Sequence, residues 1–488
     1  MGIARSGIGW FLAKTFALGA SWAASMYFTR ALATPATTLG QFYAFETIVS
    51  FLMLSSNAGL NKAMSKRIGE RESQESYVVA GAVLSGTILV AVTVLVLLAS
   101  PLVVNYFGFG GLGVLFILGL LWAIQVRSMV SAILQGYSQV GRIGGIDLFD
   151  TASRVGFQAT FVFLGFGLFG LMGGAVAGAS LAAIGSLVVL AVGVPLPSPG
   201  RIRSLFSAEY ARDLLSYAKY VFISGFATKF YDNVDIVVIT AFLGSAATGI
   251  YGIGFRFSLF LMVFSGAIST SSLPEISFHS AEENVDRVEE ILTDATVFAT
   301  VLAIPATVGM LVIAEPLIVT FYTPKFRDSA LIATVAVAIQ IPDGFRSIFR
   351  TTIDAIDRPD ITLRSGIILV LTNGVLDLIL VPTVGIGGAV AASFTAITFA
   401  TVYLGYHLLR ELELSWTVLP FRPILAEGCA AAIMGLIVWG IKQRLALPTV
   451  QLLVVLVTVG VVSYFTILLG ASASVRQRFL GIVGDIRP

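Results

Sequence analysis

Long apolar stretches separated by short polar interruptions run through the whole 488-residue chain. A helix that crosses the hydrocarbon core of a membrane needs about 20 apolar residues, and the pattern predicts about 14 such helices. Their expected limits are 7–31, 39–60, 77–99, 112–135, 146–166, 171–193, 216–242, 249–272, 294–314, 329–351, 363–381, 385–409, 423–441 and 449–470. We therefore expect an all-α polytopic membrane protein.

The composition agrees with this interpretation and also predicts an orientation. Hydrophobic residues make up 57% of the chain and charged residues 12%, with a mean hydropathy of +0.92, whereas soluble domains carry about 25% charged residues. Cytoplasmic loops carry an excess of Lys and Arg. With the N-terminus in the cytoplasm, the basic residues expected in outer loops are Lys325, Arg327, Lys442 and Arg444. The sequence thus predicts a multi-pass protein of the cell (plasma) membrane with both termini in the cytoplasm.

An internal duplication predicts two lobes. The pentapeptide Gly-Gly-Ala-Val-Ala occurs at 173–177 and again at 387–391, each time opening an apolar segment. Paired helical bundles are typical of transporters that alternate their access between two sides. We expect two pseudo-symmetric six-helix lobes, and the expected division is an N-terminal lobe at 1–194, a cytoplasmic linker at 195–215, a C-terminal lobe at 216–410, and an additional helix pair with a cytoplasmic tail at 411–488. The arginines of the Pro-rich linker suit an anionic inner leaflet.

The chain shows little that would suit a membrane enzyme. All outer loops are expected to be short, and His279 and His407 are both expected near the cytoplasmic surface, so no metal or nucleophile constellation follows from them. The single cysteine, Cys429, excludes an internal disulfide. Residues 165–170 spell Gly-x-Gly-x-x-Gly, but they follow a membrane helix rather than a strand and predict a tight turn. We expect no catalytic residue and no cofactor apart from a coupling ion.

Ionisable residues within the membrane are costly and need partners or a watery cavity. Asp150 and Arg154 are four residues apart, and Asp343 and Arg346 are three apart. At these spacings two helical side chains are neighbours, so we expect each couple to be neutralised within its own helix.

Five further charged residues come from both halves of the chain, and they are Lys14, Glu46, Arg127, Lys229 and Arg256. If their helices line a central cavity, the cations would attract an anionic head group such as a sugar-linked phosphate or pyrophosphate. Lys229 also has Asp232 three residues away. The alternative is that some of these side chains snorkel or lie at a helix end, above all Arg127.

A candidate ion site comes from the second half. Asn373 and Asp377 lie four residues apart and hence on one helix face, and Asp235 lies on an earlier helix. Two carboxylates and an amide oxygen are hard ligands that suit a small cation. A hydroxyl from Ser393 or Thr395, along with a carbonyl near Ala389, could complete the shell.

Three sequence blocks carry a family resemblance. They are residues 56–60 (Ser-Asn-Ala-Gly-Leu), residues 315–330 and residues 381–389. In their order and spacing the chain resembles the polysaccharide or oligosaccharide-lipid flippases of the multidrug/oligosaccharidyl-lipid/polysaccharide exporter superfamily, which include O-antigen and lipid II flippases. This resemblance implies two six-helix lobes forming a V, with an added helix pair as in the lipid II flippases.

The resemblance also implies a sodium site in the second lobe. Its ligands would be Asp235, Asn373, Asp377, the Ser393 hydroxyl and the Ala389 carbonyl. The cavity arginines of the lipid II flippases are matched loosely by Lys14, Lys229 and Arg256, and Glu46 departs from a purely cationic lining. Counting back from the first pentapeptide, Phe163 or Val162 takes the place of Asp377, so the first half is not expected to bind the same ion.

The sequence thus favours a flippase that moves a polyprenyl-(pyro)phosphate-linked oligosaccharide from the cytoplasmic to the outer leaflet by alternating access, with cation coupling. One alternative is a multidrug or organic cation exporter of the same superfamily. Another is a membrane enzyme of glycan assembly, which would need outer-face catalytic groups. The expected partners are the lipid-linked oligosaccharide and membrane lipids, without nucleic acid, and we expect a monomer.

Overall fold

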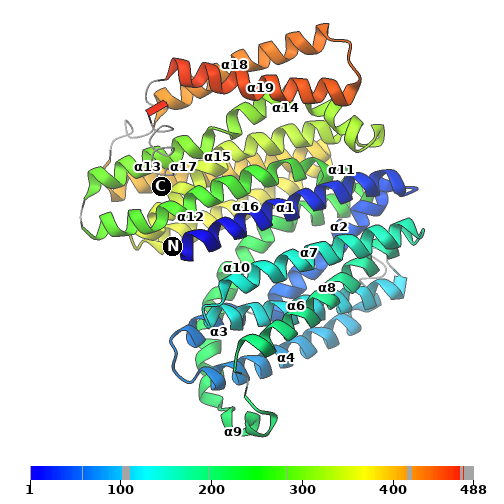
Figure 1. Ribbon diagram of the computed structural model, residues 1–488, viewed down its shortest axis with the longest axis vertical. Coiled ribbons are helices and arrows are strands. Elements are labelled where there is room, and N and C mark those ends of the chain that lie inside the picture. Colours follow the sequence, from blue (N-terminus) through cyan, green and yellow to red (C-terminus); the bar gives the residue numbers. More distant parts are fainter. Residues whose placement is uncertain are drawn as a thin grey trace. The chain divides into compact units, whose positions relative to one another are not determined.

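The computed structural model describes residues 2–57, 59–101, 110–195, 197–282, 284–414, 420–472 and 476–477, without the side chains of residues 2–14, 16, 199, 220, 223, 224, 227 and 228. Every regular element within these residues is a helix (Figure 1). Helices suit a membrane because each one satisfies its own backbone N–H and C=O groups. Within the described parts of the chain, 10 helical segments are long and apolar enough to cross a membrane. The chain is an all-helical, multi-pass membrane protein.

The chain divides into two compact units. Unit 1 is Met1–Thr240 with Gly244–Gly249, and unit 2 is Ala241–Leu243 with Ile250–Pro488. The elements of unit 1 are α1 (Gly2–Ala31), α2 (Pro35–Asn57), α3 (Leu60–Gly69), α4 (Gln74–Leu98), α6 (Gly110–Gly136), α7 (Val140–Phe163), α8 (Gly167–Gly193), η1 (Pro199–Arg201), α9 (Ile202–Leu205), most of α10 (Ala208–Leu243) and the start of α11 (Ser245–Phe255). Those of unit 2 are the rest of α11, η2 (Arg256–Ser258), α12 (Leu259–Ala281), α13 (Val285–Thr300), α14 (Ala303–Phe321), η3 (Pro324–Phe326), α15 (Ser329–Ala355), α16 (Pro359–Val384), α17 (Ile386–Glu411), α18 (Phe421–Arg444) and α19 (Thr449–Ala471).

Each apolar stretch predicted from the sequence falls on one or more helices, but two stretches contain a helix break well inside their limits, and the stretch 39–60 reaches the first residue of α3. The stretch 294–314 spans the end of α13 and the start of α14, and the stretch 249–272 spans α11, η2 and α12. Along the chain, the boundary between the compact units falls within α10 and α11. The expected boundary between the lobes is the linker 195–215. The lobe division stays a prediction.

The hydropathy pattern missed α3, which lies between the second and third predicted stretches. This helix is strongly amphipathic: Leu60, Met64 and Ile68 are fully buried, whereas Lys62 and Lys66 are exposed. Its buried side joins α4, α6, α7, α8 and α10 in an apolar core of unit 1. An amphipathic helix of this kind is too polar to be recognised as a membrane span, because its apolar residues form a narrow stripe.

The two copies of the pentapeptide pack in the same way. A Cβ atom on Gly174 of α8 would lie 2.5 Å from the backbone of Gln158 on α7. A Cβ atom on Gly388 of α17 would lie 2.3 Å from the carbonyl oxygen of Leu380 on α16. In each half, the second glycine of the repeat therefore allows close contact between the two helices of a hairpin.

Another pair of glycines brings α2 against the start of α11 within unit 1. A Cβ on Gly40 would lie 1.7 Å from the carbonyl oxygen of Ser245, and a Cβ on Gly249 would lie 2.0 Å from that of Ala36. Both glycines are therefore needed for the two backbones to approach this closely.

The turn between α7 and α8 bears out the interpretation of the Gly-x-Gly-x-x-Gly segment. Gly165 and Gly167 have φ angles of 87° and 54°, in the left-handed region that glycine adopts without strain. The segment is a helix–helix turn.

The C-terminal helix pair packs within unit 2. Helices α18 and α19 lie side by side and against α14 (Figure 1). Their core includes Met434 and Val438 of α18 and Leu456 and Tyr464 of α19.

Candidate ion and substrate sites

Helices α16 and α17 bring three of the predicted ion ligands together inside unit 2. Asn373 and Asp377 are 0% exposed, and Ser393 is 3% exposed. The amide nitrogen of Asn373 donates to Asp377 Oδ2 and to Ser393 Oγ, each at 3.3 Å. The four-residue spacing places the first two side chains on one face of α16, and the short connection at Gly385 folds α17 back against it.

The structure also distinguishes the two hydroxyls that the sequence left open. Thr395 Oγ1 donates to the carbonyl oxygen of Ala391 on its own helix at 2.8 Å. Ser393 instead contacts Asn373. Asn373, Asp377 and Ser393 therefore form a group that we call the trio. Ala389 is fully buried one turn before Ser393 on the same face of α17.

Asp235, the remaining predicted ligand, lies on α10 in unit 1 and is buried, being 7% exposed. The trio thus belongs to unit 2 and Asp235 to unit 1, and the complete ligand set stays a prediction.

The chemistry of the trio fits a sodium ion. A carboxylate, an amide and a hydroxyl supply hard oxygen atoms, and all three groups are shielded from solvent. A bound cation would supply the positive charge that a buried carboxylate such as that of Asp377 favours. Within the described residues, no three His, Cys, Asp or Glu side chains gather as a group that could hold a metal. The oxygen donors of Asn373, Asp377 and Ser393 suit a hard cation rather than a transition metal.

The charged residues of unit 1 form ion pairs between helices. Arg127 on α6 pairs with Asp147 on α7 at 2.6 Å and approaches Asp150 at 3.8 Å. Arg154 on α7 pairs with Glu46 on α2 at 2.9 Å. The predicted pairing of Asp150 with Arg154 within α7 is therefore wrong, because partners on α6 and α2 come closer than the neighbour on the same helix.

Two further pairings agree with the sequence. Arg346 Nη2 lies 2.6 Å from Asp343 on α15, as predicted. Lys229 lies 3.9 Å from Asp232 on α10, and both side chains are nearly half exposed.

The remaining two predicted cavity residues are Lys14 and Arg256. The Lys14 side chain lies outside the described residues, although its backbone belongs to α1. Arg256 begins η2 in unit 2 and is half-buried. Glu46, Arg127 and Lys229 belong to unit 1, so the structure brings no complete cavity set together within one unit.

Sequence reasoning missed a buried acid in the C-terminal helix pair. Glu427 on α18 is 0% exposed, and it accepts a hydrogen bond of 2.9 Å from Thr300 at the end of α13. Beside it, the Tyr464 hydroxyl of α19 donates to the carbonyl oxygen of Val301 at 3.0 Å. An isolated acid within an apolar helix was the available signal. Its partner lies at the break between α13 and α14, which the hydropathy pattern did not show.

Comparison with known proteins identifies the family. Residues 32–331 match the family model described as polysaccharide biosynthesis protein. The chain belongs to this family. The probable low-salt glycan biosynthesis flippase Agl15 of Haloferax volcanii is 25% identical to it over 472 residues, which cover 96% of each chain. The family resemblance stated from the sequence blocks is thereby confirmed.

Solved structures show the same fold. The lipid II flippase MurJ in an inward closed conformation superposes with a TM-score of 0.75 at 18% identity, covering 97% of this chain and 99% of its own. An inward-facing multidrug resistance MATE family transporter gives 0.65 at 18% identity, covering 81% and 94%. These proteins are flippases and transporters rather than enzymes, in agreement with the expectation from the sequence.

Proposed function

We propose that this polysaccharide biosynthesis protein is a flippase that moves a polyprenyl-(pyro)phosphate-linked oligosaccharide from the cytoplasmic leaflet to the outer leaflet. The observation that carries the proposal is the match with Agl15, which extends over 96% of both chains. Agl15 is described as a probable flippase of low-salt glycan biosynthesis. Translocation of a lipid-linked head requires no covalent step, which agrees with the 10 helical segments in the described part of the chain that are long and apolar enough to cross a membrane.

The charge network of unit 1 is the proposed contact for the anionic head. Arg127 and Arg154 each keep about a fifth to a quarter of their side-chain surface exposed while paired with carboxylates. An arginine in this state can exchange a carboxylate for a phosphate, because each anion presents a pair of oxygen atoms that can accept two hydrogen bonds from the guanidinium fork. Lys14, Lys229 and Arg256 are the further proposed contacts, and Glu46 would return to Arg154 when the head leaves.

The proposed site at which a sodium gradient would drive transport is the trio on α16 and α17. A sodium ion held by Asp235, Asn373, Asp377, Ser393 and the Ala389 carbonyl would favour the conformation that binds it more tightly, and only by its difference in affinity between conformations. The corresponding place in the first half carries Phe163 or Val162, so that half would contribute movement without an ion.

The proposed architecture is about 14 membrane helices in two pseudo-symmetric six-helix lobes followed by a helix pair, with both termini in the cytoplasm. The two lobes would rock about the central site to expose it alternately. A single chain contains both lobes, so the proposed functional form is a monomer.

A multidrug or organic cation exporter is the second candidate, and the fold shared with the MATE transporter favours it. At 18% identity that likeness concerns the fold alone. A drug exporter would have no need of partly exposed arginines such as Arg127 and Arg154, since a guanidinium released from its carboxylate would repel an organic cation. The family match and the coextensive Agl15 relative therefore favour the lipid-linked substrate.

The experiment compares the two substrates in one preparation. Purified protein is reconstituted in liposomes that contain a polyprenyl-pyrophosphate-linked oligosaccharide, and a parallel set is loaded with ethidium. We expect movement of the sugar head to the opposite leaflet without ethidium efflux. Arg127→Gln should slow the movement at least tenfold, whereas Lys325→Gln, which removes an exposed cation in the α14–α15 connection, should not. Ethidium efflux without head-group movement under any ion gradient would overturn the proposal.

A further inference from the structure

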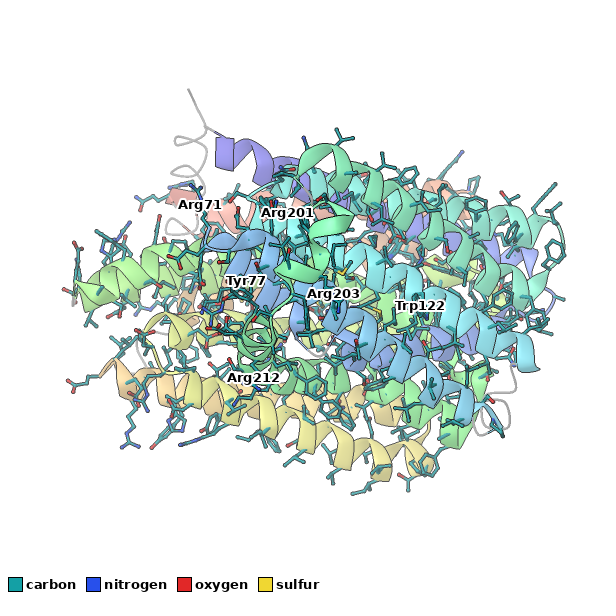
Figure 2. The ribbon with its side chains drawn as sticks, turned by 90° about the horizontal axis from the view of Figure 1, so that it is seen from below. Arg71, Tyr77, Trp122, Arg201, Arg203 and Arg212 are labelled. Carbon is teal, nitrogen blue, oxygen red and sulfur yellow. The ribbon has the colours of Figure 1, made fainter. Side chains whose placement is uncertain are left out.

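The buried acid of the C-terminal helix pair has little around it that would balance a negative charge. Exposed residues such as Arg71, Arg203 and Arg212 lie at the surface of unit 1, where their charge is solvated (Figure 2). Glu427 is instead fully buried, and its Oε1 atom has no hydrogen-bond partner among the described residues. An ionised carboxylate in such a place costs far more than a neutral acid.

Glu427 lies at a break in the backbone that a proline opens. Pro305 has no N–H, so the carbonyl oxygen of Val301, four residues earlier, has no helical donor. The Tyr464 hydroxyl of α19 donates to this oxygen at 3.0 Å and replaces the missing donor. Thr300, the last residue of α13, precedes Val301 and contacts Glu427 of α18. Polar groups of the helix pair thus close the break between α13 and α14.

The Thr300 hydroxyl has more acceptors around it than it can serve. Its Oγ1 atom lies 2.9 Å from Glu427 Oε2, and 3.1 and 3.2 Å from the carbonyl oxygens of Val297 and Thr296 in its own helix. A hydroxyl has one hydrogen to donate, whereas carbonyls and carboxylates only accept. If Glu427 is ionised, the threonine must leave its helix to donate to it. If Glu427 carries a proton, the acid donates to Thr300 and the threonine donates onward to α13, so each donor has an acceptor.

Neighbouring helices supply no counterion. Helices α13, α14 and α19 pack against α18, and within the described part of the chain no cation forms an ion pair with Glu427. Tyr464 is the titratable side chain of α19. The titratable residues closest to the break along α13 and α14 are Asp294 and Glu315, and both are acids. Arg287, the cation of α13, lies near the other end of that helix in an ion pair.

The cations of α18 are also placed elsewhere. Its exposed titratable residues are Arg422, Cys429 and Arg444. The ammonium group of Lys442 donates at 2.6 Å to the carbonyl oxygen of Val312 on α14, which lacks a helical donor because Pro316 follows four residues later. This lysine lies about four turns along α18 from Glu427, so it does not serve the acid. The face of α18 that carries Glu427 continues with Ala430 and Ala431, which belong to an apolar core.

We propose that Glu427 is a proton-binding site, whose carboxyl group carries a proton and donates it in a hydrogen bond to Thr300. The ligand is a proton rather than a metal ion, because a hard metal ion is held by several oxygen atoms. In the described residues, Thr300 Oγ1 is the hydrogen-bonding atom at this carboxyl group. The attachment of the C-terminal helix pair to the break between α13 and α14 therefore includes a bound proton. The site is separate from the trio and does not depend on the proposed function.

The test is infrared spectroscopy of the purified full chain at neutral pH. A neutral carboxylic acid has a C=O stretching band that a carboxylate lacks. We expect Glu427→Gln to lose one such band. The matched control Glu315→Gln removes an exposed acid of α14 that pairs with Arg327, and it should lose carboxylate bands instead. Loss of carboxylate bands alone in Glu427→Gln would overturn the proposal.

A second pair of variants tests the partner of the proton. Thr300→Val should shift the neutral-acid band, because the O–H of the acid loses its acceptor. Thr307→Val is the control, since this hydroxyl donates to the Ala303 carbonyl of its own helix, and it should leave the band in place. Melting curves show that each variant is folded. An unchanged band in Thr300→Val would contradict the assigned hydrogen bond.

The unaltered chain provides a measurement that needs no variant. Among the described glutamates, Glu427 is the one that is fully buried. Selective ¹³C labelling of glutamate carboxyl groups should therefore shift the neutral-acid band to lower frequency, whereas a band from a neutral aspartate would not move. A spectrum without any label-sensitive neutral-acid band would overturn the proposal.

Discussion

Removing single oxygen ligands from α16 and α17 should weaken sodium binding in a graded order. Asp377→Asn removes a buried charge, and loss of one partner from a buried charge pair costs about 3–5 kcal/mol. That corresponds to a loss of affinity on the order of 100-fold or more. Ser393→Ala removes a neutral oxygen, for which about 0.5–1.5 kcal/mol, or roughly 2- to 12-fold, is expected.

Thr395→Ala is the matched control, since it removes a hydroxyl two residues further along α17. Its Oγ1 donates to the Ala391 carbonyl of the same helix. The sodium affinity of this variant should therefore stay within about twofold of the unaltered protein.

The assay is the melting temperature of the purified protein in sodium chloride and in choline chloride at equal ionic strength. A ligand at about 100 times its Kd stabilises by about 2.7 kcal/mol, and a tenfold weaker site leaves about 1.4 kcal/mol. The sodium-dependent shift should thus be reduced by up to about half in Ser393→Ala, almost absent in Asp377→Asn and intact in Thr395→Ala. An undiminished shift in Asp377→Asn, or equal losses in the two hydroxyl variants, would refute the reasoning.

Three further predictions concern packing and charge. A double-mutant cycle with Glu46→Gln and Arg154→Met should give a coupling of about 0.5–1 kcal/mol in thermal stability, and a coupling near zero would contradict the pair. Glu427→Ala should lower stability by about 2–4 kcal/mol, whereas Glu427→Gln should cost under about 1.5 kcal/mol because it keeps the volume and an acceptor; equal melting temperatures would contradict this. Gly388→Ala should cost about 1–3 kcal/mol because its Cβ would lie 2.3 Å from a carbonyl oxygen of α16, while Gly387→Ala meets nothing within 4 Å and should be neutral or stabilising; the reverse order of melting temperatures would be inconsistent with the packing.

The sequence predicts those features that depend on one helix at a time. A run of apolar residues suffices to predict a membrane helix, and the spacing of Asn373 and Asp377 places both side chains on one face of α16. The pairing of Asp343 with Arg346 was predictable for the same reason. Amphipathic α3 was missed, since its apolar stripe over Leu60, Met64 and Ile68 does not raise the mean hydropathy of the segment.

Contacts between helices could not be read from spacing. Asp150 and Arg154 have a favourable spacing, but Arg154 reaches Glu46 on another helix and Asp150 faces Arg127. Which partner a long side chain reaches depends on the rotation and separation of neighbouring helices, and these follow from packing across the whole unit. The break between α13 and α14 escaped detection for a related reason, since the apolar run continues through it.

The measurement that tests the central claim most directly is the accessibility of a fluorescently tagged lipid-linked oligosaccharide in sealed proteoliposomes. A membrane-impermeant reductant quenches head groups in the outer leaflet of the vesicle, so protein-free vesicles lose about half of the signal. The account predicts near-complete loss when the protein is present, because heads on the inner side move outward and are quenched in turn. A loss that stays at half with folded protein in every vesicle, with or without a sodium gradient, would contradict a flippase.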